Sequence, residues 1–437
     1  MTVTLASELK LPCGVVLPNR LCKSAMTEGL ADAYDHATHG HQNLYRSWSE
    51  GGTGLLISGN IMVDKRYLER PGNVVVENHS GFAQLQSWVE AATVNGNQFW
   101  AQVSHPGRQC ARISSMRPLS PSDVQLKMLG SFAKPNPMTV EDIEEAIDRY
   151  VNTAVILKEA GFTGIQIHGA HGYLISQFLS PVTNRRTDEW GGNLENRAYF
   201  LLKIVRKCRE TLGMDYPLSV KLNSADFQKG GFTLEESAQV AKWLSDERID
   251  LLEISGGTYE QIKLLGHTGE VSDIENPEVD ENTRESTRKR EAYFLEYAQT
   301  IQSSINIPLL VTGGFRSRNT MLETLANHEL DVVGIARPLC VDPAISQKLI
   351  DGTEEKAQQY EPKLWSGAFG PASKSKVFRM VNIFGDVAWY YHQILKLAKN
   401  KPINPQLGLL NSFFSHFNRE YRIGLQRKWK QRKKSGS

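Results

Sequence analysis

The chain has 437 residues, a length that two domains or one α/β barrel with an extension can fill. Its content of 40% hydrophobic and 22% charged residues is typical of an ordinary globular protein with a sizeable core. The net charge of +2 hides an asymmetry, because eight Lys/Arg and one acidic residue follow from Arg419 onward. The rest of the chain is therefore mildly acidic.

The five cysteines are scattered along the chain, their number is odd, and no two of them form a C-x-x-C motif. This usage argues against a disulfide framework, a structural zinc site or an iron–sulfur cluster, and favours a reducing cytoplasm. Residues 1–10 lack the basic and apolar regions of a signal peptide. No apolar run reaches the roughly 18 residues that indicate a transmembrane helix.

The chain opens with a predicted hairpin over residues 9–18, which we place as a lid over the bottom of a barrel. Short apolar runs rich in branched residues then predict eight buried parallel strands. They span 21–27, 54–59, 98–104, 162–168, 217–222, 250–255, 307–312 and 331–336. Helical patterns lie between them, at 41–50, 82–95, 140–160, 197–212, 234–247, 288–302 and 318–327. This alternation predicts a (β/α)8 TIM barrel rather than an open doubly wound sheet.

Two units follow from this pattern, a barrel over 1–351 and a C-terminal extension over 352–437. We expect helices in the extension, packed on the barrel or on a partner subunit, and we interpret Trp389 to Tyr391 as core or interface. The last residues, Gln426 to Lys434, predict a solvated, partly disordered basic tail.

Active residues of such barrels follow the carboxyl ends of the strands. Small or hydrogen-bonding residues stand at nearly all of these ends. The candidates are Ala25, Met26 and Thr27; Gly59; Gln102 and His105; His168, His171 and Tyr173; Lys221; Ser255, Gly256 and Gly257; Gly313 and Gly314; Ala336 and Arg337.

The ends of strands seven and eight indicate a phosphate site. Gly313-Gly314 lets backbone amides approach an anion, and Arg337 adds a cation. The loops after these two strands are the usual phosphate site of such barrels. The alternative is a pair of tight turns that merely need glycine.

A phosphate site inside a barrel favours flavin mononucleotide. The sequence has no Walker A motif and no strand–G-x-G-x-x-G–helix unit, so it does not hold a nicotinamide in a Rossmann domain. FMN needs a hydrogen-bonding partner for its pyrimidine edge and a cation near N1 and O2. Gln102 can serve N3 and O2, Lys221 can supply the charge, and Thr27 can hydrogen-bond near O4.

The sequence resembles the old yellow enzyme family of FMN-dependent ene-reductases, also called the NADH:flavin oxidoreductase family. Seven stretches carry the resemblance in the family's order. They are Ser24-Ala-Met-Thr27, Gly52-x-Gly54 with Ser58-Gly59, Gln102-x-x-His105-x-Gly107-Arg108, Ile167-His168-Gly-Ala-His171-Gly172-Tyr173, Asn184 to Gly192, Gly313-Gly314, and Gly334-Ile-Ala336-Arg337-Pro338.

The resemblance implies roles for the residues and a reaction. His168 and His171 would bind the substrate carbonyl, and Tyr173 would donate a proton to the α-carbon. Non-covalent FMN would pass hydride from N5 to the β-carbon, and NADH or NADPH would reload it in the same pocket, a ping-pong reduction of α,β-unsaturated carbonyl compounds. The partners would then be a small activated alkene and a nicotinamide nucleotide, without nucleic acid, and a homo-oligomer is possible.

Some residues depart from the family pattern or allow other interpretations. Lys221 stands where many members carry Arg, and the cysteine-rich segment and dinucleotide domain of larger relatives are missing.

The alternatives to an ene-reductase are a non-catalytic flavin-barrel interaction or sensor protein and a 2,4-dienoyl-type reductase without an iron–sulfur cluster. The pair His168 and His171, and the group His36, His39 and His41, have a spacing that metal ligands can have. We instead expect no metal site, and a polar loop or a helix start at the second group. We interpret Arg186 and Asp188 as an ion pair that braces a loop.

Overall fold

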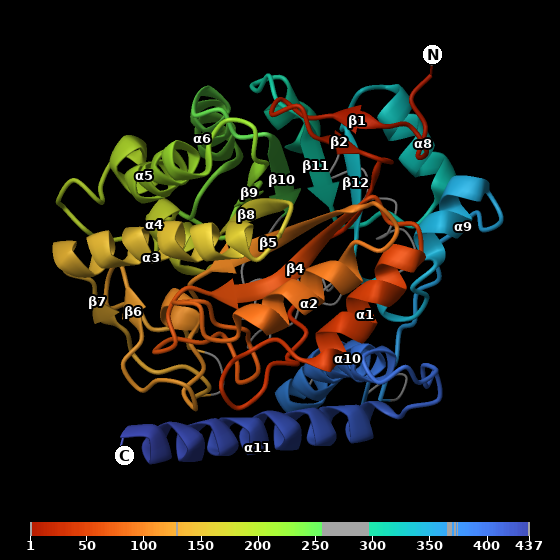
Figure 1. Cartoon of the computed structure of the whole chain (residues 1–437). Helices are drawn as coiled ribbons and strands as arrows, with labels where there is room; N and C mark the ends of the chain where they lie inside the picture. Colours follow the sequence, from red (N-terminus) through yellow and green to blue (C-terminus); the bar gives the residue numbers. More distant parts are fainter. Residues whose placement is uncertain are drawn as a thin grey trace.

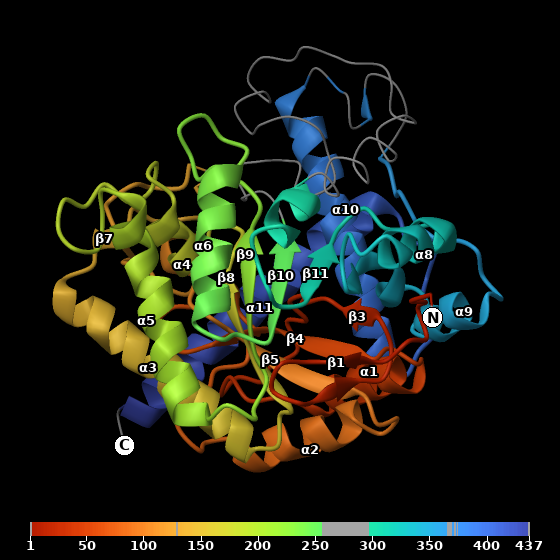
Figure 2. The same ribbon diagram turned by 90° about the horizontal axis from the view of Figure 1, so that it is seen from above.

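The computed structural model describes residues 2–127, 130–255, 297–364, 369–370, 373 and 375–435. Eight parallel strands close into a barrel, with helices around its outside (Figures 1 and 2). The predicted TIM barrel is therefore confirmed. The strands, in chain order, are β3 (Leu21–Lys23), β4 (Leu55–Met62), β5 (Gln98–Ser104), β8 (Gly164–Gly169), β9 (Leu218–Asn223), β10 (Leu251–Ser255), β11 (Leu309–Thr312) and β12 (Val332–Ile335).

Each strand falls on one of the predicted apolar runs, although the bounds of most differ by one or more residues. The first strand ends at Lys23 instead of continuing to Thr27, so residues 24–27 lie in the loop that follows it. The second continues beyond Gly59 to Met62, and a bulge between Ile57 and Asn60 shifts its pairing with β5. Every residue of β4, β8, β9 and β10 is buried, as expected for parallel strands covered by helices.

The helices around the barrel follow the predicted pattern. They are α1 (His39–Glu50), α2 (Phe82–Ala92), α3 (Val140–Glu159), α4 (Leu174–Leu179), α5 (Leu194–Leu212), α6 (Leu234–Asp246), α8 (Arg318–Ala326) and α9 (Ile345–Asp351), with 3-10 turns η1 (Gly107–Gln109) and η4 (Arg337–Cys340). A capping box starts α3, since the Thr139 hydroxyl accepts from the Asp142 amide and the Asp142 carboxylate accepts from the Thr139 amide. Most of the predicted helix at 288–302 lies outside the described residues.

The predicted hairpin forms the lid of the barrel. Strand β1 (Leu9–Lys10) pairs antiparallel with β2 (Val16–Leu17), and Gly14 takes a φ of 92° in the turn. Leu11 and Leu17 pack into one apolar cluster with residues near the starts of the strands, among them Leu55, Leu251, Leu310 and Val332. The hairpin therefore closes the end of the barrel opposite the candidate site. A small parallel ladder, β6 (Leu119–Ser120) with β7 (Asn136–Pro137), lies outside it.

The extension forms two long helices, α10 (Lys376–Leu397) and α11 (Leu409–Ser435). They pack against each other, and α10 also contacts α1 and η4 (Figure 1). Trp389 and Tyr390 are buried in the main core, which confirms the core interpretation of this segment. None of the helices in the described part of the chain is long and apolar enough to span a bilayer.

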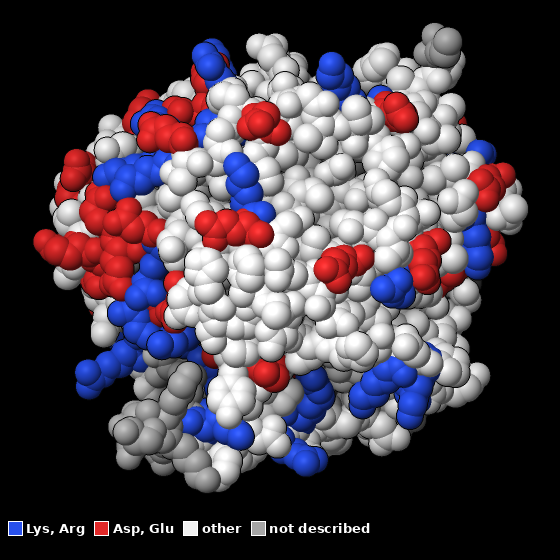
Figure 3. Space-filling view, in the orientation of Figure 1, with Lys and Arg blue, Asp and Glu red and all other residues white. Residues whose placement is uncertain are grey.

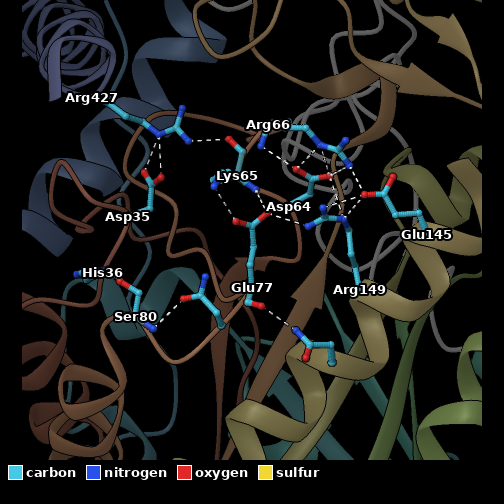
Figure 4. Close-up of polar contacts among 12 residues, drawn as sticks. Asp35, His36, Asp64, Lys65, Arg66, Glu77, Ser80, Glu145, Arg149 and Arg427 are labelled. Carbon is cyan, nitrogen blue, oxygen red and sulfur yellow. Dashed lines mark hydrogen bonds and ion pairs between the residues drawn. The ribbon is translucent and has the colours of Figure 1, made fainter. Parts of the chain in front are cut away.

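The predicted tail is helical and not disordered, and it is only partly solvated: Gln426 and Lys428 are exposed, but Arg427 is buried. Helix α11 continues to Ser435, and Arg427 is only 5% exposed. Its guanidinium pairs with the carboxylate of Asp35 (Nε to Oδ1 2.7 Å) and donates to the backbone carbonyl of Lys65 (2.7 Å), as Figure 4 shows. The basic composition of this segment predicted that it is solvated. The buried carboxylate of Asp35, 392 positions earlier in the chain, nevertheless binds Arg427.

Candidate functional site

Two histidines and a tyrosine converge after the fourth barrel strand. His168 lies within β8, and the segment after the strand returns His171 and Tyr173 to it. The rings of His168 and His171 lie 5.3 Å apart, and those of His168 and Tyr173 lie 4.8 Å apart. Both pairs are close to perpendicular. The three side chains predicted to bind and protonate a substrate therefore form one cluster.

The backbone of His171 is held in an unusual conformation. Its φ is 61°, in the left-handed region that non-glycine residues rarely adopt. The Asn223 side chain accepts from the His171 amide (2.9 Å), and Gln109 donates to the His171 carbonyl (3.1 Å). Gln177 donates to the next carbonyl, that of Gly172 (2.6 Å). Backbone strain sustained by such surrounding bonds is frequent at functional sites.

Both imidazoles are held in the neutral form. Burial, then the neighbouring His171 and the Lys221 ammonium, lowers the pKa of His168 well below the usual 6.5. Burial and Lys221 do the same to the pKa of His171. His168 Nδ1 accepts from the Ala170 amide (3.3 Å), so its proton belongs on Nε2. His171 Nε2 contacts the Ser255 hydroxyl (2.9 Å).

A chain of buried polar side chains crosses the barrel interior below the histidines. Gln102 donates to the Gln166 side chain (2.8 Å), Gln166 donates to Glu253 (2.8 Å), and Glu253 pairs with Lys221 (2.8 Å). The strand register explains this arrangement, because Gln102 lies opposite Gln166, and Lys221 lies opposite both His168 and Glu253. Thr312 also donates to Glu253 (2.6 Å).

Sequence reasoning missed Gln166 and Glu253. Each is a polar residue in the middle of an apolar run that was predicted to be a buried strand. That signal was available in the sequence, because a polar group buried in a strand needs a hydrogen-bonding partner. The predicted cation Lys221 is therefore one half of a buried ion pair, with the side chains of Lys221 and Glu253 exposed by 3% and 0%.

A second buried network positions the loop after β3, which holds Ala25, Met26 and Thr27. Lys23 is fully buried and donates to the Tyr45 hydroxyl (3.0 Å), which in turn donates to Glu28. Glu28 also accepts from the Gly59 amide (2.8 Å). A Cβ on Gly59 would lie 2.4 Å from the Met26 carbonyl oxygen, so only glycine allows this approach. Thr27 donates to Glu69 (3.1 Å).

The candidate phosphate residues follow β11 and β12. Gly313 and Gly314 have φ values of 128° and 82°, conformations that favour glycine. Arg337, directly after Ala336, pairs with Asp386 of α10 (Nη1 to Oδ2 3.7 Å) and lies over the Tyr390 ring (5.9 Å). Burial raises the pKa of Asp386 to about 6. The extension therefore contacts this end of the site, which the sequence did not reveal.

The remaining candidates have structural roles or lie outside the described residues. His36 contacts Ser80 (2.9 Å), and His41 Nδ1 accepts from the Thr38 amide at the start of α1, as the helix-start interpretation predicts. Arg186 and Asp188 form the expected ion pair (2.5 Å). Gly256 and Gly257 lie outside the described residues.

The donor set at the open end of the barrel fits FMN. Gln102 offers an amide and Thr27 a hydroxyl, as an isoalloxazine edge requires, and Lys221 offers a cation. The two left-handed glycines and Arg337 offer backbone approach and charge for a phosphate. These groups come from β5, β9 and the segments after β3, β11 and β12, so the barrel itself brings them to one end.

Comparison with known proteins identifies the family. A family model described as the NADH:flavin oxidoreductase / NADH oxidase family matches residues 10–356. This chain belongs to that family. It is therefore an oxidoreductase with FMN as cofactor and NADH or NADPH as electron donor.

Curated relatives include two fungal enzymes. An NADH-dependent flavin oxidoreductase, iliE, from Hypocrea jecorina is 32% identical over 82% of this chain and 92% of its own length. The NADH-dependent flavin oxidoreductase iccE from Talaromyces variabilis is 30% identical over 90% of this chain and 98% of its own. The second match covers more of the chain than residues 1–356 can supply, so part of the extension is shared with that relative.

Solved structures support the same fold. A 2-naphthoyl-CoA reductase complex aligns with a TM-score of 0.72 at 25% identity, covering 81% of this chain and 53% of that one. An old yellow enzyme homologue from Zymomonas mobilis aligns with a TM-score of 0.67 at 22% identity, covering 82% and 95%.

Proposed function

We propose that this flavin oxidoreductase reduces the C=C bond of α,β-unsaturated carbonyl compounds, with His168 and His171 as the carbonyl clamp and Tyr173 as the proton donor. The observation that carries the proposal is the ring cluster at the end of β8, with centroids 4.8 and 5.3 Å apart. The free thiols of all five cysteines support a reducing compartment, and we propose the cytoplasm.

Neutral imidazoles suit the task of a carbonyl clamp. Each has one N–H that can donate to the carbonyl oxygen, and this bond strengthens as negative charge develops on the oxygen. The Ala170 amide directs the His168 proton to Nε2, and Asn223 and Gln109 hold the His171 backbone in place. Donors fixed before the substrate arrives need little reorganisation during the reaction.

Tyr173 would move a proton beside this clamp. It is 3% exposed and forms the N-cap of α4, and the preceding turn holds its ring against His168. A phenol protected from bulk water can deliver its proton to the α-carbon of a bound enolate. When bound, FMN supplies the hydride for the β-carbon.

Gln102 and Lys221 would hold the flavin ring. The bond from Gln102 to Gln166 fixes the orientation of the amide, and Glu253 fixes the position of the Lys221 ammonium. Ala25, Met26 and Thr27, in the loop after β3, and Gly59 of β4 would line the ring. Gly313, Gly314, Ala336 and Arg337 would bind the phosphate.

Flavin spectroscopy tests the reaction. The purified protein should carry a flavin absorbance that bleaches anaerobically with NADH or NADPH and recovers when a cyclic enone is added. A saturated ketone is the matched control and should leave the flavin reduced. Protein that can be reduced but is not reoxidised by any of a panel of enones would contradict the proposed substrate class.

Ligand binding tests the clamp separately. Phenols resemble the enolate and should bind the oxidised protein. Replacing His168 or His171 by Ala should weaken that binding about tenfold or more, because each charge-assisted hydrogen bond contributes about 1.5–3 kcal/mol. Substitution of exposed His79 is the control. Unchanged affinity in both clamp variants would refute the assignment.

A further inference from the structure

Helix α11 exposes apolar side chains along one side, which we call its outer face. The members recur every three or four residues and so lie on one side of the helix. They are Leu410, Phe414, Phe417, Tyr421, Leu425 and Trp429. Phe414 is 65% exposed and Tyr421 is 58% exposed, although large apolar groups are usually covered.

The opposite side of α11 is the one that fastens it to the barrel. His416 and Arg427 are buried there, and Arg427 pairs with Asp35 (Figure 4). Arg419 donates to the Gly29 carbonyl (2.6 Å). A Cβ on Gly424 would lie 2.6 Å from the Ile113 side chain, so the helix approaches the barrel closely. The outer face is therefore not needed to hold the helix in place.

The charges beside the outer face have one sign. Arg422 and Lys428 are exposed next to the apolar residues, and Lys430 follows. The only acidic residue of α11, Glu420, faces inward to Arg70 (3.2 Å) and His416 (3.4 Å). Figure 3 shows Lys and Arg along the edge of the molecule where α11 lies in Figure 1, whereas Asp and Glu gather over the region of α3.

We propose that α11 docks the protein onto an anionic lipid surface, lying in the plane of the interface with its outer face toward the lipid. Helices with Phe, Leu and Trp on one side and flanking Lys or Arg bind such surfaces through apolar burial and charge attraction. A two-fold contact between two copies of α11 is disfavoured, since it would bring the same cationic residues together.

Docking through α11 would also determine where the candidate site lies relative to the lipid surface. Its inner side contacts Gly29, Lys65 and Ile113, which follow the carboxyl ends of β3, β4 and β5. These are the ends at which the candidate site is built. A docked molecule would therefore hold the catalytic end of its barrel next to the lipid surface, a placement suited to apolar substrates.

Vesicle co-sedimentation of the full FMN-loaded chain tests the proposal. We expect binding to vesicles that contain phosphatidylserine, weak binding to pure phosphatidylcholine vesicles, and release as salt rises, because the attraction is screened. The double variant Phe414→Ser with Phe417→Ser should weaken binding at least about tenfold, since two apolar side chains lose their burial. Arg422→Glu with Lys428→Glu should weaken it similarly.

Matched surface variants serve as controls. Met214→Ser removes an exposed apolar side chain from a distant loop, and Lys242→Glu reverses an exposed charge on α6. Both should bind like the unaltered protein. All variants should retain their flavin and their turnover of a water-soluble enone, since none of these residues belongs to the site, and this readout separates docking from the proposed reaction.

Three outcomes would overturn the proposal. One is no binding to anionic vesicles, and another is binding that the outer-face variants leave unchanged. The third is that the unaltered chain forms an oligomer and does not bind vesicles, and that the Phe414→Ser, Phe417→Ser variant dissociates this oligomer. That result would show that a second copy covers the outer face.

Discussion

At the scale of single residues, His171, one of the two proposed clamp residues, has a strained backbone. A φ of 61° brings its ring back toward His168, and side chains from β9 and η1 bond to its amide and carbonyl. These bonds offset the conformational strain, which is about 1–3 kcal/mol for a non-glycine residue in this region. The proposed clamp would therefore depend on β9 and η1 as well as on the local motif.

The role of Tyr173 can be tested by removing one hydroxyl. We expect Tyr173→Phe to slow the oxidative half-reaction by about a hundredfold or more, because a placed general acid contributes roughly 10²–10⁴-fold. Flavin reduction by NAD(P)H should be unaffected, since that step needs no proton from the phenol. Stopped-flow absorbance of both half-reactions measures this, with exposed Tyr34→Phe as control. Equal slowing of both halves would contradict the role.

The role of Arg337 can be tested by comparing two flavins. Arg337→Gln should weaken FMN binding about 10- to 100-fold, because a hydrogen bond to a charged group contributes about 1.5–3 kcal/mol. Riboflavin, which lacks the phosphate, should bind as before. Fluorescence quenching gives both dissociation constants, and exposed Arg248→Gln is the control. Equal weakening for both flavins would place Arg337 away from the phosphate.

At the scale of elements, the extension contacts the end of the barrel that carries the candidate site. Asp386 of α10 pairs with Arg337, and Glu420 of α11 pairs with Arg70, whose neighbour Glu69 accepts from Thr27. Arg70 also lies over the Tyr391 ring of α10 (4.4 Å). Arg337 thus contacts the extension directly, and Thr27 is linked to it through Glu69 and Arg70.

The anchor of α11 gives a prediction at this scale. Removing one partner of a buried ion pair costs about 3–5 kcal/mol, so Arg427→Ala should release the end of α11. We expect amide exchange after residue 420 to become at least about a hundredfold faster, measured by mass spectrometry. Lys428→Ala, at the exposed neighbouring position, should change little. Similar exchange in both variants would mean that other contacts hold the helix.

At the scale of the whole molecule, buried histidines make stability depend on pH. Burial lowers the pKa of His41 and of His105 from 6.5 to about 4. Above pH 6.5 these rings are neutral in both the folded and the unfolded chain. As the pH falls from 6.5 toward 4, the unfolded chain binds protons that the folded chain does not, so the free energy of unfolding decreases.

Urea unfolding at several pH values measures this effect. Each such histidine should remove about 2 kcal/mol from the free energy of unfolding between pH 7 and pH 5. His41→Gln should make the pH dependence shallower by that amount, whereas His79→Gln, at an exposed position, should leave it unchanged. Identical slopes in the two variants would show that His41 does not resist protonation in the fold.

The sequence by itself determined the barrel, the lid hairpin and the grouping of His168, His171 and Tyr173. Apolar runs and helical periodicity are local patterns. A closed parallel barrel brings all carboxyl ends of its strands to one rim, so the residues at those ends are predicted to lie together. Only the tertiary structure decided the partners of those residues. The Gln166–Glu253–Lys221 network needs the register of separate strands, and the positions of Asp386 and Arg427 depend on contacts between residues far apart in the chain. Local patterns predict which groups are polar or buried, but the pairing of buried charges is fixed only when distant segments pack together.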